Sequence, residues 1–134
     1  MINLNNSLCL ATAAISCSPP SHAINTAIVD TGASDHYFTP GAPLLHVNTA
    51  APSTTIRTAT GEAKSSTATA VLAIPSIPTL AARTGHIIPG FTNNLISLGK
   101  LCDADCTAYL DKTSIHVTAK NGNKVFHGTR EPTG

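Results

Sequence analysis

The residues of this chain that are best suited to chemistry are Asp30, Thr31 and Gly32, which follow a short apolar run at residues 26–29. The β-branched residues of that run favour a strand, so we expect the Asp30 carboxylate where the strand gives way to a tight loop. The Thr31 hydroxyl can hydrogen-bond within such a loop, and Gly32 has no Cβ to block a passing chain. Only Asp30 brings acid–base chemistry. The triplet alone also fits an Asx-type turn with an ordinary surface carboxylate.

Two blocks of sequence around this triplet carry a family resemblance. Residues 25–38 read NTAIVDTGASDHYF, and residues 86–103 read HIIPGFTNNLISLGKLCD. Both resemble the protease segment of Ty1/copia-type retrotransposon Gag-Pol polyproteins, which belongs to the retropepsin-like aspartic peptidases. The resemblance spans residues 25–130 and implies an all-β fold, a small closed or half-closed barrel of the retropepsin type with one short helix. The chain departs from the family in lacking an aromatic residue shortly before Asp30 and in having no Trp.

The resemblance also implies roles for the residues of the loop. Asp30 would be the catalytic acid, and Thr31 and Gly32 would support the catalytic loop. The residues that would contact the substrate are Ala33, Ser34 and Asp35. The Leu98-Gly99 pair would pass under the loop.

A hairpin is expected between strands at residues 54–60 and 63–74, with a turn at residues 59–62. By resemblance this hairpin is the candidate flap. Gly61 lies in its turn and would permit close approach of the backbone to an extended peptide. A plain solvated hairpin is the alternative.

The chain has 134 residues and contains one Asp-Thr-Gly triplet. These two facts determine how many copies of the chain such a site would need. Aspartic peptidase chemistry needs two carboxyl groups that share one proton, and one small domain supplies only one. We therefore expect a homodimer with one Asp30 from each copy, acting on a polyprotein peptide without a cofactor. The alternatives are a catalytically inactive relic or binding module of the same ancestry, and a secreted β protein that is not a peptidase.

Composition argues against other partners. The formal net charge is +1 and only 11% of residues are charged, so no footprint for direct contact with nucleic acid is visible. The cysteine pairs Cys9/Cys17 and Cys102/Cys106 lack the Cys-x-x-Cys spacing of metal sites, and the six histidines are scattered. We expect no metal site, and thiols that stay reduced in a cytosolic setting.

The ends of the chain differ from its middle. Residues 1–23 contain no Asp, Glu, Lys or Arg, so we interpret residues 1–24 as a flexible linker or polyprotein remnant and residues 131–134 as a tail. The apolar run at residues 8–15 lacks the basic start of a signal peptide and is too short to cross a bilayer. We expect no membrane contact and a cytoplasmic location, including virus-like particles, rather than secretion.

Further elements follow from the hydrophobic pattern. Asn93 or Asn94 is expected to cap a helix at residues 95–104. The Asn121-Gly122 pair predicts a hairpin turn. The remaining expected strands are residues 44–47, 84–88, 107–110, 114–118 and 124–127.

Overall fold

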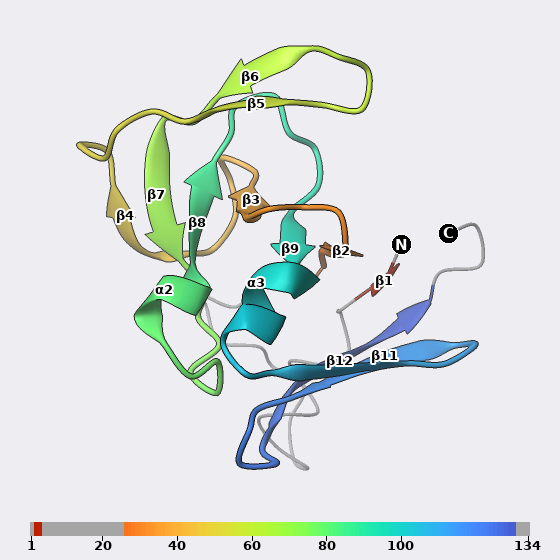
Figure 1. Ribbon diagram of the computed structural model, residues 1–134. Helices are drawn as coiled ribbons and strands as arrows, with labels where there is room; N and C mark the ends of the chain where they lie inside the picture. Colours follow the sequence, from red (N-terminus) through yellow and green to blue (C-terminus); the bar gives the residue numbers. More distant parts are fainter. Residues whose placement is uncertain (1, 4–25, 131–134) are drawn as a thin grey trace.

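The structure, a computed structural model, describes residues 2–3 and 26–130 of the chain (Figure 1). Its strands are β1 (Ile2–Asn3), β2 (Ile28–Asp30), β3 (His36–Phe38), β4 (Leu45–Asn48), β5 (Thr55–Arg57), β6 (Ala63–Ser65), β7 (Ala68–Val71), β8 (Thr84–Ile87), β9 (Leu95–Ser97), β10 (Thr107–Leu110), β11 (Ser114–Thr118) and β12 (Lys124–Arg130). Its helices are α2 (Leu80–Arg83) and α3 (Leu98–Asp103).

A six-stranded mixed sheet in the order β2-β9-β3-β8-β7-β4 positions the candidate loop. At its edge β2 and β9 run parallel, with Asp30 opposite Ser97. Strand β3 pairs with β9 in the antiparallel sense and with β8 in the parallel sense. The loop after Asp30 therefore starts at β2, passes the end of β9 and re-enters the sheet at β3.

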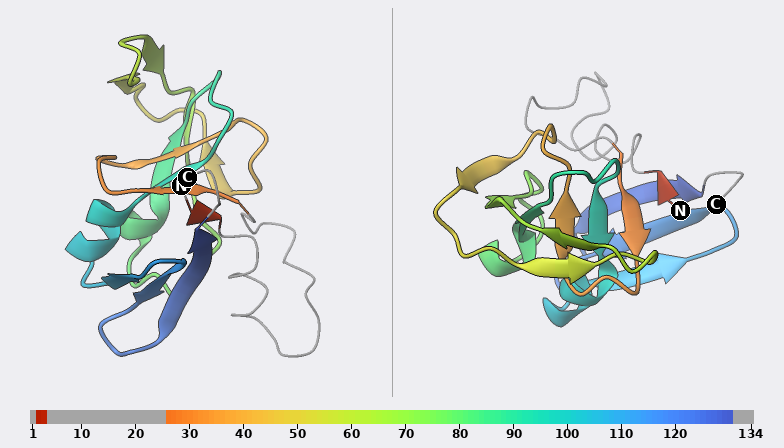
Figure 2. Two further views of the ribbon diagram at one scale, coloured as in Figure 1. Left: turned by 90° about the vertical axis from the view of Figure 1, so that its right-hand side faces the viewer. Right: turned by 90° about the horizontal axis from the view of Figure 1, so that it is seen from above.

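The other strands form two smaller sheets. A four-stranded sheet in the order β1-β12-β11-β10 lies at the opposite end of the molecule from the β5–β6 hairpin (Figure 1). The hairpin forms a two-stranded sheet of its own. Seen from above, it crosses over the end of the six-stranded sheet (Figure 2). It is therefore placed above the edge that carries Asp30.

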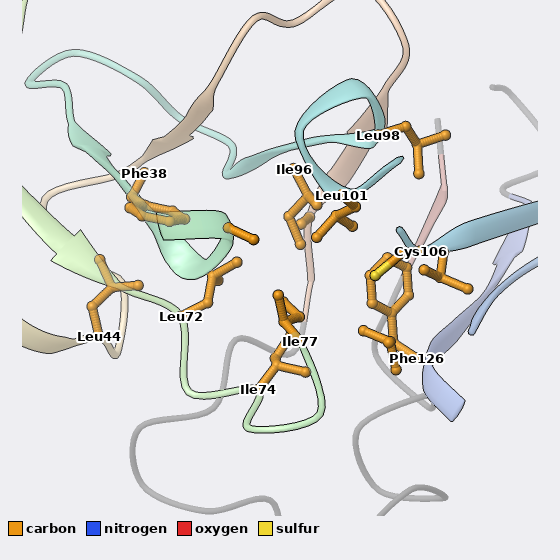
Figure 3. Close-up of a cluster of buried hydrophobic side chains, with 14 of the residues drawn as sticks. Phe38, Leu44, Leu72, Ile74, Ile77, Ile96, Leu98, Leu101, Cys106 and Phe126 are labelled. Atoms are coloured by element: carbon orange, nitrogen blue, oxygen red, sulfur yellow. The ribbon is translucent and has the colours of Figure 1, made fainter. Parts of the chain in front are cut away.

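One hydrophobic core joins the two larger sheets. Phe38 from β3 and Phe126 from β12 are both fully buried in the same cluster. Between them lie Leu72, Ile74 and Ile77, which follow β7 (Figure 3). Because these aliphatic side chains fill the space between the sheets, the six-stranded sheet has a rigid support beneath the candidate loop.

The all-β expectation is confirmed, because the described residues are mostly strand with two short helices. The expected closed barrel is not found, because the described strands form three open sheets in which β10 and β4 have no partner on the outer side. The half-closed alternative of the retropepsin type stays a prediction. The expectation of one helix was also wrong. Helix α2 forms after Pro78, where Thr79 caps it by accepting a hydrogen bond from the Ala82 amide at 3.1 Å.

The helix expected at residues 95–104 begins three residues later than the sequence indicated. Leu95–Ser97 is strand β9, because pairing with β2 and β3 satisfies its backbone. Ser97 is the cap of α3 instead of Asn93 or Asn94. Asn94 instead accepts a hydrogen bond from the Thr39 amide at 2.9 Å.

The ends of the chain are described only in part. Ile2 and Asn3, within the expected linker at residues 1–24, pair with the end of β12. The rest of that segment and the tail at residues 131–134 lie outside the described residues. Neither described helix has the length and apolarity that crossing a membrane requires.

Candidate active site

Asp30 is the last residue of β2, and its carboxylate is partly exposed at the start of the loop. The Gly32 amide donates a hydrogen bond of 2.7 Å to its Oδ1 atom. This is an Asx-type turn, so the local geometry that sequence alone also allowed is present. The turn fixes the carboxylate and leaves it accessible.

The Asp30 carboxylate borders a pocket of about 510 Å³ between the loop and the β5–β6 hairpin. Among the described residues that line it, Asp30 is the only acidic one. Four of the residues expected at the site are therefore brought together. The lining consists of Asp30, Gly32, Ala33, Ser34, Tyr37, residues 55–59 of the hairpin, Phe91 and Leu95.

Three other expected residues lie outside this lining. Thr31 is exposed in the loop beside it. Gly61 lies in the hairpin turn, where its amide donates to the Thr58 carbonyl at 2.8 Å and its φ is +86°. An added Cβ would meet nothing within 4 Å, so the left-handed backbone of the turn explains the glycine. The hairpin faces the pocket with residues 55–59 instead.

Asp35 is held in a cluster of charged groups behind the loop. Its Oδ1 atom accepts hydrogen bonds from Lys100 Nζ at 2.5 Å and from the His36 amide at 2.8 Å. Its Oδ2 atom lies 3.1 Å from His86 Nε2. Burial raises the pKa of Asp35, but the Lys100 ammonium and the other hydrogen bonds outweigh it and hold that pKa below its usual value. Both carboxylate oxygens are thus engaged within the chain.

Ser97 ties the loop to the sheet. Its hydroxyl donates a hydrogen bond of 2.6 Å to the Ala33 carbonyl and accepts one of 3.1 Å from the Lys100 amide at the start of α3. A serine therefore interrupts the aliphatic run at residues 95–98 because one hydroxyl both caps the helix and holds the backbone of the loop.

His36 is the structural residue of the site that sequence reasoning missed. It is fully buried at the start of β3. Its Nδ1 atom accepts from the Ser97 amide at 3.0 Å, and its Nε2 atom donates to the Ala82 carbonyl at 2.7 Å. This bonding pattern requires the neutral ring. Burial is the main cause that lowers the pKa of His36 to about 4.

Tyr37 forms the wall of the pocket. Its hydroxyl is hydrogen-bonded to Ser34 Oγ at 3.1 Å. Its ring stacks on His86 with 6.1 Å between centroids and meets Phe91 edge-on at 6.2 Å. The aromatic wall therefore has one polar tip beside the loop and an apolar body.

The possible metal ligands and the cysteines of the described part of the chain bear on the expectations from the sequence. No group of three or more His, Cys, Asp or Glu side chains is placed to hold a metal ion there. Cys102 and Cys106 are free thiols, and burial raises the pKa of Cys106. Cys9 and Cys17 lie outside the described residues.

Comparisons with known proteins add no family assignment. No protein-family model matches the chain, and no match was found among curated proteins or among solved structures.

Proposed function

We propose that this chain is an aspartic endopeptidase of the retropepsin type, which hydrolyses peptide bonds of a retrotransposon polyprotein as a homodimer. The observation that carries the proposal is the position of Asp30. Asp30 is the last residue of β2. The Gly32 amide fixes its carboxylate by a hydrogen bond of 2.7 Å, and the carboxylate borders a pocket beneath the β5–β6 hairpin. A positioned and accessible carboxylate of this kind is suited to general acid–base catalysis.

The chemistry requires a second carboxyl group. One Asp30 would activate the attacking water, and its partner would hold the shared proton and donate it to the leaving amine. Since Asp30 is the only acid among the described residues that line the pocket, the second carboxyl would come from another copy of the chain. The exposed Thr31 and Gly32 leave the face of the loop open to that copy. Two copies of the chain would then form one peptidase.

The shape of the pocket supports a peptide as the substrate. Its volume of about 510 Å³ lies within the range of ligand-binding clefts. It lies between a loop and a two-stranded hairpin whose backbone groups can pair with an extended chain. Ser34 and the backbone of Ala33 line it and can bind the substrate main chain. No cofactor is needed for this reaction.

The test compares the wild type with Asp30→Asn on a pool of quenched fluorescent peptides and on a longer precursor that contains the chain. The asparagine can still accept the Gly32 hydrogen bond, so the turn survives while the shared proton is lost. Asp103→Asn, which changes an exposed acid on α3, is the matched control. We expect cleavage by the wild type and the control only. Equal cleavage by Asp30→Asn, or none by a folded wild type, would refute the peptidase and leave the relic or binding module.

A further inference from the structure

A second pocket extends the candidate active site along the hairpin. It measures about 590 Å³ and is bordered by Thr58, Ala59, Phe91 and Leu95, which also border the Asp30 pocket. The two pockets therefore adjoin along these residues, and we call them together the hairpin groove. At the end away from Asp30 it is lined by Lys64 of β6 and Gly90.

Lys64 lies beside Gly90 in the groove, in space that a side chain at position 90 would fill. The side chain is 22% exposed, and its Nζ atom lies only 2.8 Å from where a Cβ on Gly90 would be. Gly90 has a φ of +91°, so its backbone also favours glycine. The absence of a side chain at position 90 therefore leaves the space that the ammonium group occupies.

The ammonium group has spare hydrogen-bonding capacity. A lysine offers three donors, and its one recorded partner in the described residues is Glu62 Oε1 at 3.4 Å. That distance is long for an ionic hydrogen bond, and the Glu62 side chain is 65% exposed. The residues that the structure describes in the lining of this pocket include no Asp or Glu. The half-buried ammonium group of Lys64 thus faces a groove whose described lining residues include no acid, and Glu62 approaches it from outside the groove.

We propose that the Lys64 end of the hairpin groove is a subsite for a carboxylate, filled by an acidic side chain of the bound peptide. The proposal rests on the proposed function, because it places that side chain to one side of the scissile bond at Asp30. Lys64 would donate to the carboxylate, with the hydroxyls of Thr60 and Thr92 as further donors on the lining. Glu62 would compete for the same ammonium group from outside the groove.

The experiment scans Glu, Gln and Lys through each position of an amidated peptide that the wild type cleaves. Amidation removes the terminal carboxylate, so a preference for Glu comes from the side chain. We expect Glu to raise kcat/KM about tenfold over Gln at one position. Lys64→Met should abolish that preference, Lys64→Glu should invert it in favour of Lys, and Glu62→Gln should increase it. Lys112→Met, in the exposed turn between β10 and β11, should change nothing.

The design separates this proposal from the peptidase itself. If peptides are cleaved but no position favours Glu, or if the preference survives in Lys64→Met, the subsite is refuted and the peptidase stands. If no peptide is cleaved, an amidated, fluorescently labelled peptide from the cleavage pool is scanned with Glu and Gln in the same way, and its binding to the Asp30→Asn variant is measured by fluorescence anisotropy. Tighter binding of a Glu peptide that depends on Lys64 supports the subsite in a binding module. Equal binding of Glu and Gln peptides overturns it.

Discussion

Protonation of His36 should destabilise the fold, and the pH at which this happens follows from the structure. The neutral ring is needed because Nδ1 accepts from the Ser97 amide while Nε2 donates to the Ala82 carbonyl. Its pKa in the folded chain is about 4, below its ordinary value of 6.5. The unfolded chain therefore takes up the proton at a higher pH than the folded chain does. The stability that His36 contributes is present above pH 6.5 and is lost as the pH falls toward 4.

The size of this effect can be worked out from the two pKa values. Their difference corresponds to about 3 kcal/mol at 1.36 kcal/mol per pKa unit, most of which is lost by pH 4.5. Asp35 acts in a separate window. Its folded pKa is held below 3.8, so its contribution is lost only at still lower pH.

The assay is equilibrium urea unfolding of the full chain at several pH values between 7 and 4.5, followed by far-UV circular dichroism because the chain has no Trp. Protein concentration is kept fixed, since association would add to stability. His36→Gln should cost about 1–3 kcal/mol at pH 7, because it leaves a buried partner of the ring unpaired. The difference in free energy of unfolding between the wild type and this variant should shrink as the pH falls. His46→Asn, at an exposed histidine, should follow the wild type. Parallel pH profiles for wild type and His36→Gln would refute the reasoning.

Two further predictions concern the packing and charge behind the loop. Gly85→Ala should lower the free energy of unfolding in urea by about 3 kcal/mol, because the new Cβ would lie 2.6 Å from His36 Cβ and from Phe38. Gly41→Ala is the control and should be neutral, since a Cβ there meets nothing within 4 Å. Equal effects of the two changes would contradict the packing described. Lys100→Met should raise the pKa of Asp35 in a carboxyl NMR titration, because burial would then act without the ammonium that now outweighs it. An unchanged pKa would show that the ion pair does not form in solution.

The four-stranded sheet with β10, β11 and β12 was the part of the fold that the sequence predicted best. The bounds of β10 and β11 match those expected. In β11 apolar and polar residues alternate, with Ile115 and Val117 buried, which is the pattern of a half-buried strand. Asn121-Gly122 lies between β11 and β12 as expected, with Gly122 at a φ of +87°. Local pattern is sufficient where pairing is between neighbours in sequence.

The sheet around the site was harder to predict because its contacts are between distant residues. All three residues of strand β3 are buried and show no alternation, so the strand carries no signal of its own in the sequence. Leu95–Ser97 has an apolar pattern that suits a helix as well as a strand, and its pairing with β2 makes it a strand. His36 hydrogen-bonds to Ala82 and Ser97, which lie 46 and 61 positions away, so nothing near it in the sequence indicates its role.

The candidate site was predicted in part. Asp30 and Ser34 both line the pocket, and residues 55–59 of the hairpin line it from another side. Asp35 is engaged by Lys100 and His86, which no local pattern connects to it. The peptidase activity and the retropepsin relationship stay predictions.

The central claim is that two Asp30 residues from two copies make one site, and a mixing experiment tests it most directly. Wild type and Asp30→Asn chains are denatured together, refolded at a constant total concentration above that needed for dimerisation, and assayed for peptide cleavage. When half of the chains are mutant, a shared site predicts that activity falls to about one-quarter, because only one dimer in about four then has two intact Asp30 residues. A fall to about one-half would show that each chain carries a complete site and would contradict the account.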